Sequence, residues 1–384
     1  ITSAGQLEEF CKNLQSAEIL AVDTEFVREK TYFHRVGLIQ VSSGEHFAAI
    51  DPVLLSDLTP LLELFKDPSK LKIFHAARQD LEILVRMCGQ IITPVFDTQI
   101  AAALVGWGTQ ISFAKIVHKA LGKKLHKSET YTDWCRRPLS DSQIEYAIDD
   151  VRYLVPVYKK LVERLIKMGR LDWVRGEVLA WEDPKTFALP EPQKRLMKIK
   201  NLRSLKPRNL TVLNELVAWR EGEAVTRDCL PKNIVRDETL LEIARKVPKD
   251  LNALSEFRGF HQRELGKSGS AILSAIAKAL EIPEENLVVL PESNGHTTIR
   301  GVEELLAAYV QIRSEELKIE PSVLADRKKI HSFVTHYEQK LDMDEHFLFQ
   351  GWRKDLIGSP MLLLLSGKVG LKIDASGQVC LINP

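Results

Sequence analysis

The stretch LAVDTEF, residues 20–26, places two carboxylates at the end of an apolar run. Such a run is typical of a buried strand, and side chains two residues apart on a strand point to the same face. Asp23 and Glu25 are therefore expected side by side. Two carboxylates on one face repel each other and lose hydration, so a folded chain retains the pair only where a cation offsets that cost.

The size and composition of the chain indicate several domains of ordinary globular character. At 384 residues the chain exceeds what one hydrophobic core usually serves, so two or three domains are expected. The 53 Lys and Arg nearly balance the 52 Asp and Glu, which gives a net charge of +1. Only the distribution of this charge can therefore favour or disfavour a polyanionic partner.

The cysteines and the apolar segments predict a cytoplasmic protein. The five cysteines are scattered and form no CxxC motif: Cys11, Cys88, Cys135, Cys229 and Cys380. A dispersed, odd set of this kind is typical of reduced thiols in the cytosol. No uninterrupted apolar segment approaches the roughly 20 residues that a membrane helix needs.

The first 170 residues predict an α/β domain. The runs ILAVDTEF, VGLIQVSS and HFAAIDP have the pattern of consecutive strands, and LKIFHAA is a further strand candidate. Helical patterns alternate with them: LTPLLELFKD, QDLEILVRMCG closed by Gly89, and FDTQIAAALVG with Asp97 or Thr98 as N-cap. A long helix is expected from about Ser142 to Met168. This order predicts a mixed sheet flanked by helices.

The remaining chain is expected to be helical. Residues 171–204 contain the proline-rich stretch EDPKTFALPEPQKR and are predicted to form a linker and a connecting helix. Helical periodicity beyond them predicts two small all-α domains, at residues 205–285 and 296–384. The terminal run VGLKIDASGQVCLI instead predicts a hairpin around Ser376 and Gly377.

Three further residues join the carboxylate pair as a candidate catalytic set. Asp80 follows a strand in HAARQDLEIL, and Asp150 lies in EYAIDDVRYL one helical turn after Tyr146. Carboxylates without His or Cys suit Mg²⁺ or Mn²⁺ rather than zinc. Two such ions about 3.5–4 Å apart catalyse phosphoryl transfer. A tyrosine whose unperturbed pKa is about 10 is better suited to orient water than to act as a general base.

The order and spacing of these motifs resemble a known group of nucleases. DTEF, HAARQDLEIL and YAIDDVRYL resemble the DEDD superfamily of 3′-5′ exonucleases in its tyrosine subclass. Within it, KSETYTDWCRRPLSDSQIEYAIDDVRYL is similar to the ribonuclease D family. NLTVLNELVAWREGEAVTRDCLPKNIVRDETLLEIARKVP resembles an HRDC domain, and the region with HFLFQGWRKDLI resembles a second, divergent HRDC-like domain.

The resemblance implies an RNase H-like exonuclease domain followed by two HRDC-type domains. It implies metal ligands at four acidic positions and a catalytic tyrosine: Asp23, Glu25, Asp80, Asp150 and Tyr146. The Tyr-x-x-x-Asp spacing selects Asp150 over Asp149. The implied reaction hydrolyses 3′-terminal phosphodiesters and releases nucleoside 5′-monophosphates. The implied substrates are tRNA precursors and other small structured RNAs, acted on by a monomer with two Mg²⁺ or Mn²⁺.

Two alternative functions are open. A DNA-directed member of the same superfamily would carry the same acidic set, because the residue that reads the ribose 2′-hydroxyl cannot be identified from spacing. A non-catalytic RNA-binding scaffold should have lost at least one acidic ligand, and this chain has lost none.

Several other polar residues have competing interpretations. For Asp97, helix capping is favoured over a substrate role, and for His75 a hydrogen-bonded core position is favoured over catalysis. Lys127, Arg136 and Arg137 are either phosphate contacts or solvated loop charges.

Positive charge is concentrated in one part of the helical region. From Arg195 to Arg236 there are ten basic and four acidic residues, a local net charge of +6. This segment is either a platform for the RNA backbone or a solvated helical surface.

Overall fold

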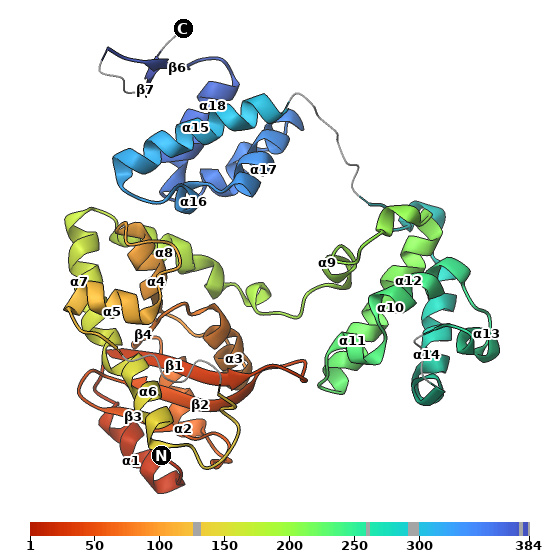
Figure 1. Ribbon diagram of the computed structural model, residues 1–384, viewed down its shortest axis with the longest axis horizontal. Helices are drawn as coiled ribbons and strands as arrows, with labels where there is room; N and C mark the ends of the chain where they lie inside the picture. The colour runs from red at the N-terminus through yellow and green to blue at the C-terminus, as the bar shows by residue number, and fades with distance from the viewer. Residues whose placement is uncertain (126–131, 259–261, 291–298, 376–378, 383–384) are drawn as a thin grey trace. The chain divides into compact units, whose positions relative to one another are not determined.

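The computed structural model describes residues 1–125, 132–258, 262–290, 299–375 and 379–382. The chain divides into two compact units. The first comprises Ile1–Glu25, Val36–Phe187 and Gly295–Pro384, and the second comprises Phe26–Arg35 and Ala188–Asn294. Each unit has its own hydrophobic core, and most helices and strands of both are labelled in Figure 1.

A five-stranded mixed sheet organises the first unit. Its strands are β1 (Ile19–Val27), β2 (Arg35–Ser42), β3 (Phe47–Ile50), β4 (Leu71–Phe74) and β5 (Val95–Asp97), in the order β3-β2-β1-β4-β5. β2 and β3 are antiparallel, whereas β1 with β4 and β4 with β5 are parallel. The predicted mixed sheet is therefore confirmed.

Helices cover both faces of this sheet, so β1 is buried on both sides. Leu20 and Val22 pack into one core with α1 (Ala4–Asn13), α2 (Thr59–Lys66) and α3 (Arg78–Cys88). Ala21 packs into the other core with α4 (Thr98–Leu104), α5 (Phe113–Leu121), α7 (Leu154–Lys167) and α8 (Leu171–Val178). Because side chains alternate along a strand, Asp23 and Glu25 continue the face of Ala21, whereas Thr24 points toward α3.

The predicted single helix over residues 142–168 is wrong. The structure has α6 (Asp141–Arg152) and α7, separated at Tyr153. Pro156 explains the break, because a proline ring collides with the carbonyl four residues earlier in a continuous helix, which is that of Arg152. α6 begins with a capping box formed by Ser140 and Gln143.

The C-terminal helices belong to the first unit. They are α15 (Ile299–Leu317), α16 (Pro321–Leu324), α17 (Arg327–Glu338) and α18 (Ser359–Leu365), followed by β6 (Gly370–Ile373) and β7 (Val379–Ile382). β6 and β7 form the predicted antiparallel hairpin, whose expected turn at Ser376 and Gly377 lies outside the described residues. The rings of Trp173 and Trp352 stack with centroids 4.4 Å apart and join these helices to α8.

The second unit is a helical domain that also contains the segment after Glu25. Its helices are α9 (Pro192–Leu196), α10 (Pro207–Thr226), α11 (Pro231–Ile234), α12 (Asp237–Lys246), α13 (Leu251–Ser255) and α14 (Gln262–Glu281). Tyr32 is buried in their core, and its hydroxyl donates a hydrogen bond to Glu221 at 3.1 Å. The backbone N–H of Phe33 donates to Asp228 at 3.1 Å. The sequence patterns did not predict that residues 26–35 belong to this unit.

The structure also bears on the cysteines and on membrane-spanning helices. The five cysteines are free thiols, of which Cys11 and Cys88 are buried. Over the described ranges, no helix combines the length and apolar character that crossing a membrane requires.

Candidate active site

Three carboxylates converge at the end of β1. One oxygen from each of Asp23, Glu25 and Asp150 lies within 4.8 Å of the other two. The first two come from β1 and the third from α6, and all three side chains are partly exposed. Within the described part of the chain, no lysine or arginine forms an ion pair with any of them. The cluster therefore has no cationic partner supplied by the described protein atoms.

The pKa values of these three carboxyls are all raised. Burial, followed by repulsion from neighbouring carboxylates, raises the pKa of Asp23 well above its usual range and that of Glu25 to about 9. Burial, followed by the charge of Asp149, raises the pKa of Asp150 to about 7. Protons are held in this cluster because protein atoms alone do not compensate its negative charge. A divalent cation would compensate it.

Asp80 approaches the cluster from the other side of β1. It lies buried in the first turn of α3, and its Oδ1 accepts a hydrogen bond from the Thr24 hydroxyl at 2.5 Å. Burial and the charge of Asp23 raise its pKa, while the bond from Thr24 opposes that rise. Sequence analysis missed Thr24. Its position between two carboxylates, facing the opposite side of the strand, was the available signal.

Tyr146 contacts the cluster from α6. Its hydroxyl is hydrogen-bonded to Asp150, one turn later on the same helix. Burial and the charges of nearby carboxylates raise the pKa of Tyr146, so its phenol remains a protonated donor. Its ring stacks on Trp134 with centroids 6.2 Å apart and an interplanar angle of 29°. The structure thus brings together the tyrosine and the acidic residues that the motifs singled out.

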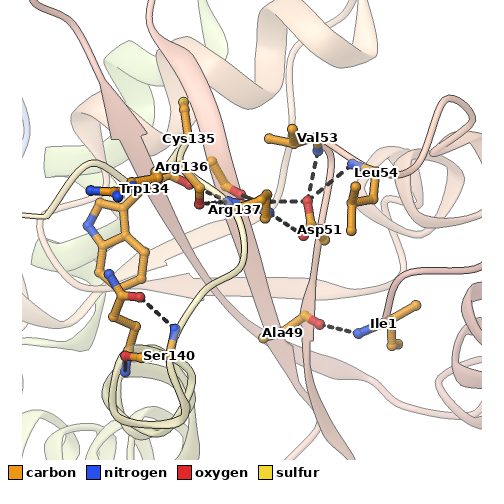
Figure 2. A network of polar contacts seen from close by, with 12 residues as sticks. Ile1, Ala49, Asp51, Val53, Leu54, Trp134, Cys135, Arg136, Arg137 and Ser140 are labelled. Carbon is orange, nitrogen blue, oxygen red and sulfur yellow. Dashed lines mark hydrogen bonds and ion pairs between the residues drawn. The ribbon is translucent and has the colours of Figure 1, made fainter.

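Arg137 holds the loop that carries Trp134 (Figure 2). Its guanidinium makes two hydrogen bonds to Asp51, both at 2.6 Å, and donates to the carbonyls of Trp134 at 2.8 Å and Gly37 at 2.6 Å. Burial alone would raise the pKa of Asp51, but its bonds from Arg137 and from two backbone N–H groups lower it. Arg137 is therefore a structural clamp rather than a phosphate contact or a solvated charge.

The same loop packs closely on β2. A Cβ atom at Gly37 would overlap the backbone carbonyl of Trp134, so the close approach requires glycine at this position. Trp134 is buried in a small cluster with Leu38 and Ala147. Because Ala147 follows Tyr146 on α6, this packing orients the helix that presents the tyrosine. Lys127, the other basic residue considered for this loop, lies outside the described residues.

The preferred interpretations of Asp97 and His75 are confirmed. The Asp97 carboxylate accepts hydrogen bonds from the backbone N–H groups of Gln99 at 2.7 Å and Ile100 at 3.1 Å, as an N-cap does. The His75 Nε2 lies 3.0 Å from the carbonyl oxygen of Ile111, and burial lowers its pKa.

Asp149 lies apart from the carboxylate cluster. Its carboxylate forms an ion pair with Arg152 at 2.6 Å. It does not belong to the group of mutually close oxygens that includes Asp150.

Much of the positive charge in the second unit is engaged within that unit. Arg220 pairs with Asp237 at 2.7 Å, and Arg208 donates to carbonyls at the end of α14, including that of Ala279 at 3.3 Å. Two other arginines form ion pairs with glutamates: Arg195 with Glu221, and Arg227 with Glu223 and Glu264. At least four of the ten basic residues are thus engaged in structural contacts within the unit.

Comparison with known proteins places the chain in a family. Residues 1–166 match the 3′-5′ exonuclease family model, and residues 209–276 match the HRDC domain model. A curated ribonuclease D from Granulibacter bethesdensis is 35% identical, with 100% of this chain and 96% of the relative aligned. The chain belongs to the ribonuclease D family. Members of this family are 3′-5′ exoribonucleases, so the carboxylate cluster is the candidate site of a hydrolase that uses divalent metal.

Solved structures agree with this assignment. Escherichia coli RNase D, described as an exoribonuclease involved in structured RNA processing, matches with a TM-score of 0.84 and 33% identity over 95% of this chain and 98% of that one. The catalytic core of RRP6 from Trypanosoma brucei matches with a TM-score of 0.56 and 24% identity over 73% of this chain and 79% of that one. The latter similarity is one of fold.

Proposed function

We propose that this member of the ribonuclease D family removes nucleotides one at a time from the 3′ ends of tRNA precursors and other small structured RNAs, releasing nucleoside 5′-monophosphates. The observation that carries the proposal is the convergence of Asp23, Glu25 and Asp150 without a protein cation. Asp80 and Tyr146 reach the same place from α3 and α6. The relatives named ribonuclease D and the similarity to the Escherichia coli enzyme support RNA as substrate.

The donor set fits magnesium or manganese. It offers carboxylate oxygens and no His or Cys, which is the ligand chemistry that these hard cations prefer. Asp23, Glu25 and Asp150 would hold one ion, Asp23 would bridge to a second, and Asp80 would support the second directly or through water. Bound at such sites, divalent ions lower the pKa of the attacking water and neutralise charge at the scissile phosphate.

The chain itself supplies positioning. Tyr146 remains protonated and donates to Asp150, so its hydroxyl is suited to orient the water nucleophile rather than to remove its proton. Thr24 holds the Asp80 carboxylate in one orientation by donating to it. Catalysis would then rest on alignment and charge neutralisation at the last phosphodiester.

We propose a division of the chain into four segments, two of which the family matches support. We propose an exonuclease domain at 1–170, a linker and connecting helix at 171–204, a first HRDC domain at 205–285 and a divergent second one at 296–384. The matches at 1–166 and 209–276 support the first and third of these boundaries. We also propose that the protein is a cytoplasmic monomer, and its free thiols are consistent with a reducing compartment.

A time course on a 3′-extended tRNA labelled at its 5′ end tests the proposal. Reactions contain Mg²⁺, Mn²⁺ or EDTA, and a parallel series uses Asp23→Asn. A metal-dependent ladder of shorter labelled products that the substitution abolishes is expected. Intact RNA that still shifts on a native gel would instead establish a binding scaffold. Faster degradation of the matching DNA strand would establish the DNA-directed alternative.

A further inference from the structure

A basic pocket lies on the first unit, separate from the residues of the carboxylate cluster. It has a volume of about 730 Å³ and is lined by α5, the loop before α5 and the residues that follow it. Three lysines line it, Lys115, Lys119 and Lys124, together with the ring of Trp107. Glu320, which follows α15, forms part of one wall.

The three lysines present positive charge to the pocket. All three side chains are exposed, and none forms an ion pair with a carboxylate among the residues that the structure describes. From residue 108 to 125 the sequence contains no Asp or Glu. The arginines of the second unit differ, because Arg208, Arg220 and Arg227 are engaged by that unit's own carbonyls and carboxylates. Unpaired cations lining one pocket favour an anionic ligand.

Trp107 adds an aromatic surface to this charge. Its ring is partly exposed, with Lys119 Nζ 5.7 Å and the guanidinium of Arg164 5.6 Å from the ring centroid. A ring next to cations at the edge of a pocket is the combination that binds single-stranded nucleic acid, in which bases stack and phosphates meet lysines. Glu320 also lines the pocket and accepts a hydrogen bond from the Thr109 hydroxyl at 2.8 Å.

One histidine links the pocket wall to the sheet that carries the carboxylates. Ile111 lines the pocket, and its carbonyl oxygen lies 3.0 Å from His75 Nε2. β1 and β4 are parallel with Ala21 opposite Ile73, and two residues further along these chains come Asp23 and His75. His75 therefore lies just beyond β4, the strand that pairs with β1, and is hydrogen-bonded to the pocket wall. An RNA strand whose 3′ end reaches the carboxylates would continue toward Trp107.

We propose that this pocket binds the RNA strand upstream of the scissile bond, with Lys115, Lys119 and Lys124 contacting phosphates and Trp107 stacking a base. This inference rests on the proposed function, because it assigns a second contact region to the same substrate. The pocket contributes affinity for long substrates and leaves the chemical step to the carboxylate cluster.

The test compares the triple variant Lys115→Gln/Lys119→Gln/Lys124→Gln with a control that removes equal charge elsewhere. The control triple changes three exposed lysines near the C-terminus: Lys328, Lys368 and Lys372. Binding of a fluorescent 3′-extended tRNA is measured in EDTA over a range of salt concentrations. The pocket variant is expected to weaken binding at least about tenfold near 0.1 M salt and to reduce the slope of log Kd against log salt by about two, because three phosphate contacts are lost. The control should behave as wild type.

A second substrate separates this inference from the proposed function. An RNA dinucleotide without a 5′-phosphate has no phosphate upstream of the scissile bond for the three lysines to contact, so the pocket variant should cleave it at the wild-type rate with Mg²⁺. Wild-type affinity and salt slope in the pocket variant would overturn the pocket assignment while leaving the exonuclease intact. Failure of the wild-type protein to cleave either substrate would overturn the proposed function itself.

Discussion

Two charged regions near the same strands differ in whether their carboxylates have a cationic partner. At the end of β1, Asp23, Glu25 and Asp150 converge with no cationic partner among the described side chains. Beyond β3, Asp51 receives two hydrogen bonds from Arg137, and every other bond of that guanidinium goes to a backbone carbonyl. The first region has raised carboxyl pKa values, whereas the pKa of Asp51 is lowered.

The difference indicates that the carboxylate cluster serves to bind a ligand, whereas the Asp51–Arg137 ion pair serves to stabilise the fold. A buried ion pair whose hydrogen bonds are satisfied fixes a geometry, and here that geometry is the loop under Tyr146. Carboxylates without a partner cost stability and persist where a bound cation offsets the cost. Substitutions in the two regions should therefore separate activity from stability.

The largest effect is expected for Asp23→Asn. Removal of the carboxylate that would bridge both ions should lower kcat on a 3′-extended RNA at least about 10³-fold, because both ions would lose a ligand. Each tenfold loss of kcat corresponds to ~1.4 kcal/mol of lost transition-state stabilisation. The metal-free variant should be at least as stable as wild type, since repulsion in the cluster falls. Thermal unfolding in EDTA checks this, and a substantial loss of stability would contradict the contrast drawn above.

Arg137→Gln should have the opposite profile. Asp51 would remain buried without its partner, so the free energy of unfolding should fall by about 3–5 kcal/mol. Urea denaturation measures this change. The matched control is Arg137→Gln with Asp51→Asn, which removes the unpaired charge and should recover part of the loss. A single variant that loses less than ~1 kcal/mol would show that the clamp is not structural.

Tyr146→Phe should have an intermediate effect on activity. The hydroxyl that donates to Asp150 is lost while the ring on Trp134 is kept, so kcat should fall about 10- to 100-fold with little change in KM or stability. Single-turnover kinetics on an RNA dinucleotide isolates this step. If the hydroxyl acted only in folding, the melting temperature rather than kcat would change.

The smallest effect concerns pH. In the metal-free fold the pKa of Glu25 is about 9 and that of Asp150 about 7, whereas in the unfolded chain both carboxyls titrate near pH 4. Between about pH 4 and these raised pKa values, the folded state holds protons that the unfolded chain has released. The free energy of unfolding of the metal-free protein therefore falls as pH rises through this range. Mg²⁺ binds the ionised cluster, so it should raise the melting temperature by a few degrees more near pH 8.5 than near pH 6.

Asp150→Asn supplies the control for that measurement, because other groups titrate over the same range. The Mg²⁺-induced rise in melting temperature should depend on pH in the wild type and depend less on pH in this variant. Equal Mg²⁺ stabilisation at both pH values would show that these carboxyls do not titrate as described.

The sequence predicted the acidic set because its members lie in short motifs with fixed spacing. Asp23 and Glu25 alternate on one strand, and Tyr146 and Asp150 are one helical turn apart, so local geometry already groups them. Partners separated by many residues were not predictable. Asp51 and Arg137 stand 86 residues apart, and no periodicity connects them.

Two other features were missed although the local sequence indicates them. Pro156 marked the end of α6, yet the apolar periodicity on both sides favoured one continuous helix. Thr24 looked like a spacer between two carboxylates, although strand alternation turns its hydroxyl toward Asp80. In both cases a stereochemical rule was available, but the apolar pattern obscured it at Pro156 and the flanking carboxylates obscured it at Thr24.

Tyr32 has a consequence for how this protein can be divided into pieces. The segment after Glu25, which includes the end of β1, places this side chain inside a helical core built from residues that begin at 188. A chain cut after residue 187 would keep the strands of the nuclease sheet but would lose residues 295–384 of the first unit, and it would expose Tyr32 and Phe33 as an uncovered aromatic loop after β1. Such a fragment would tend to self-associate through that loop. The second unit is thus a cover for part of the nuclease sequence as well as a module in its own right.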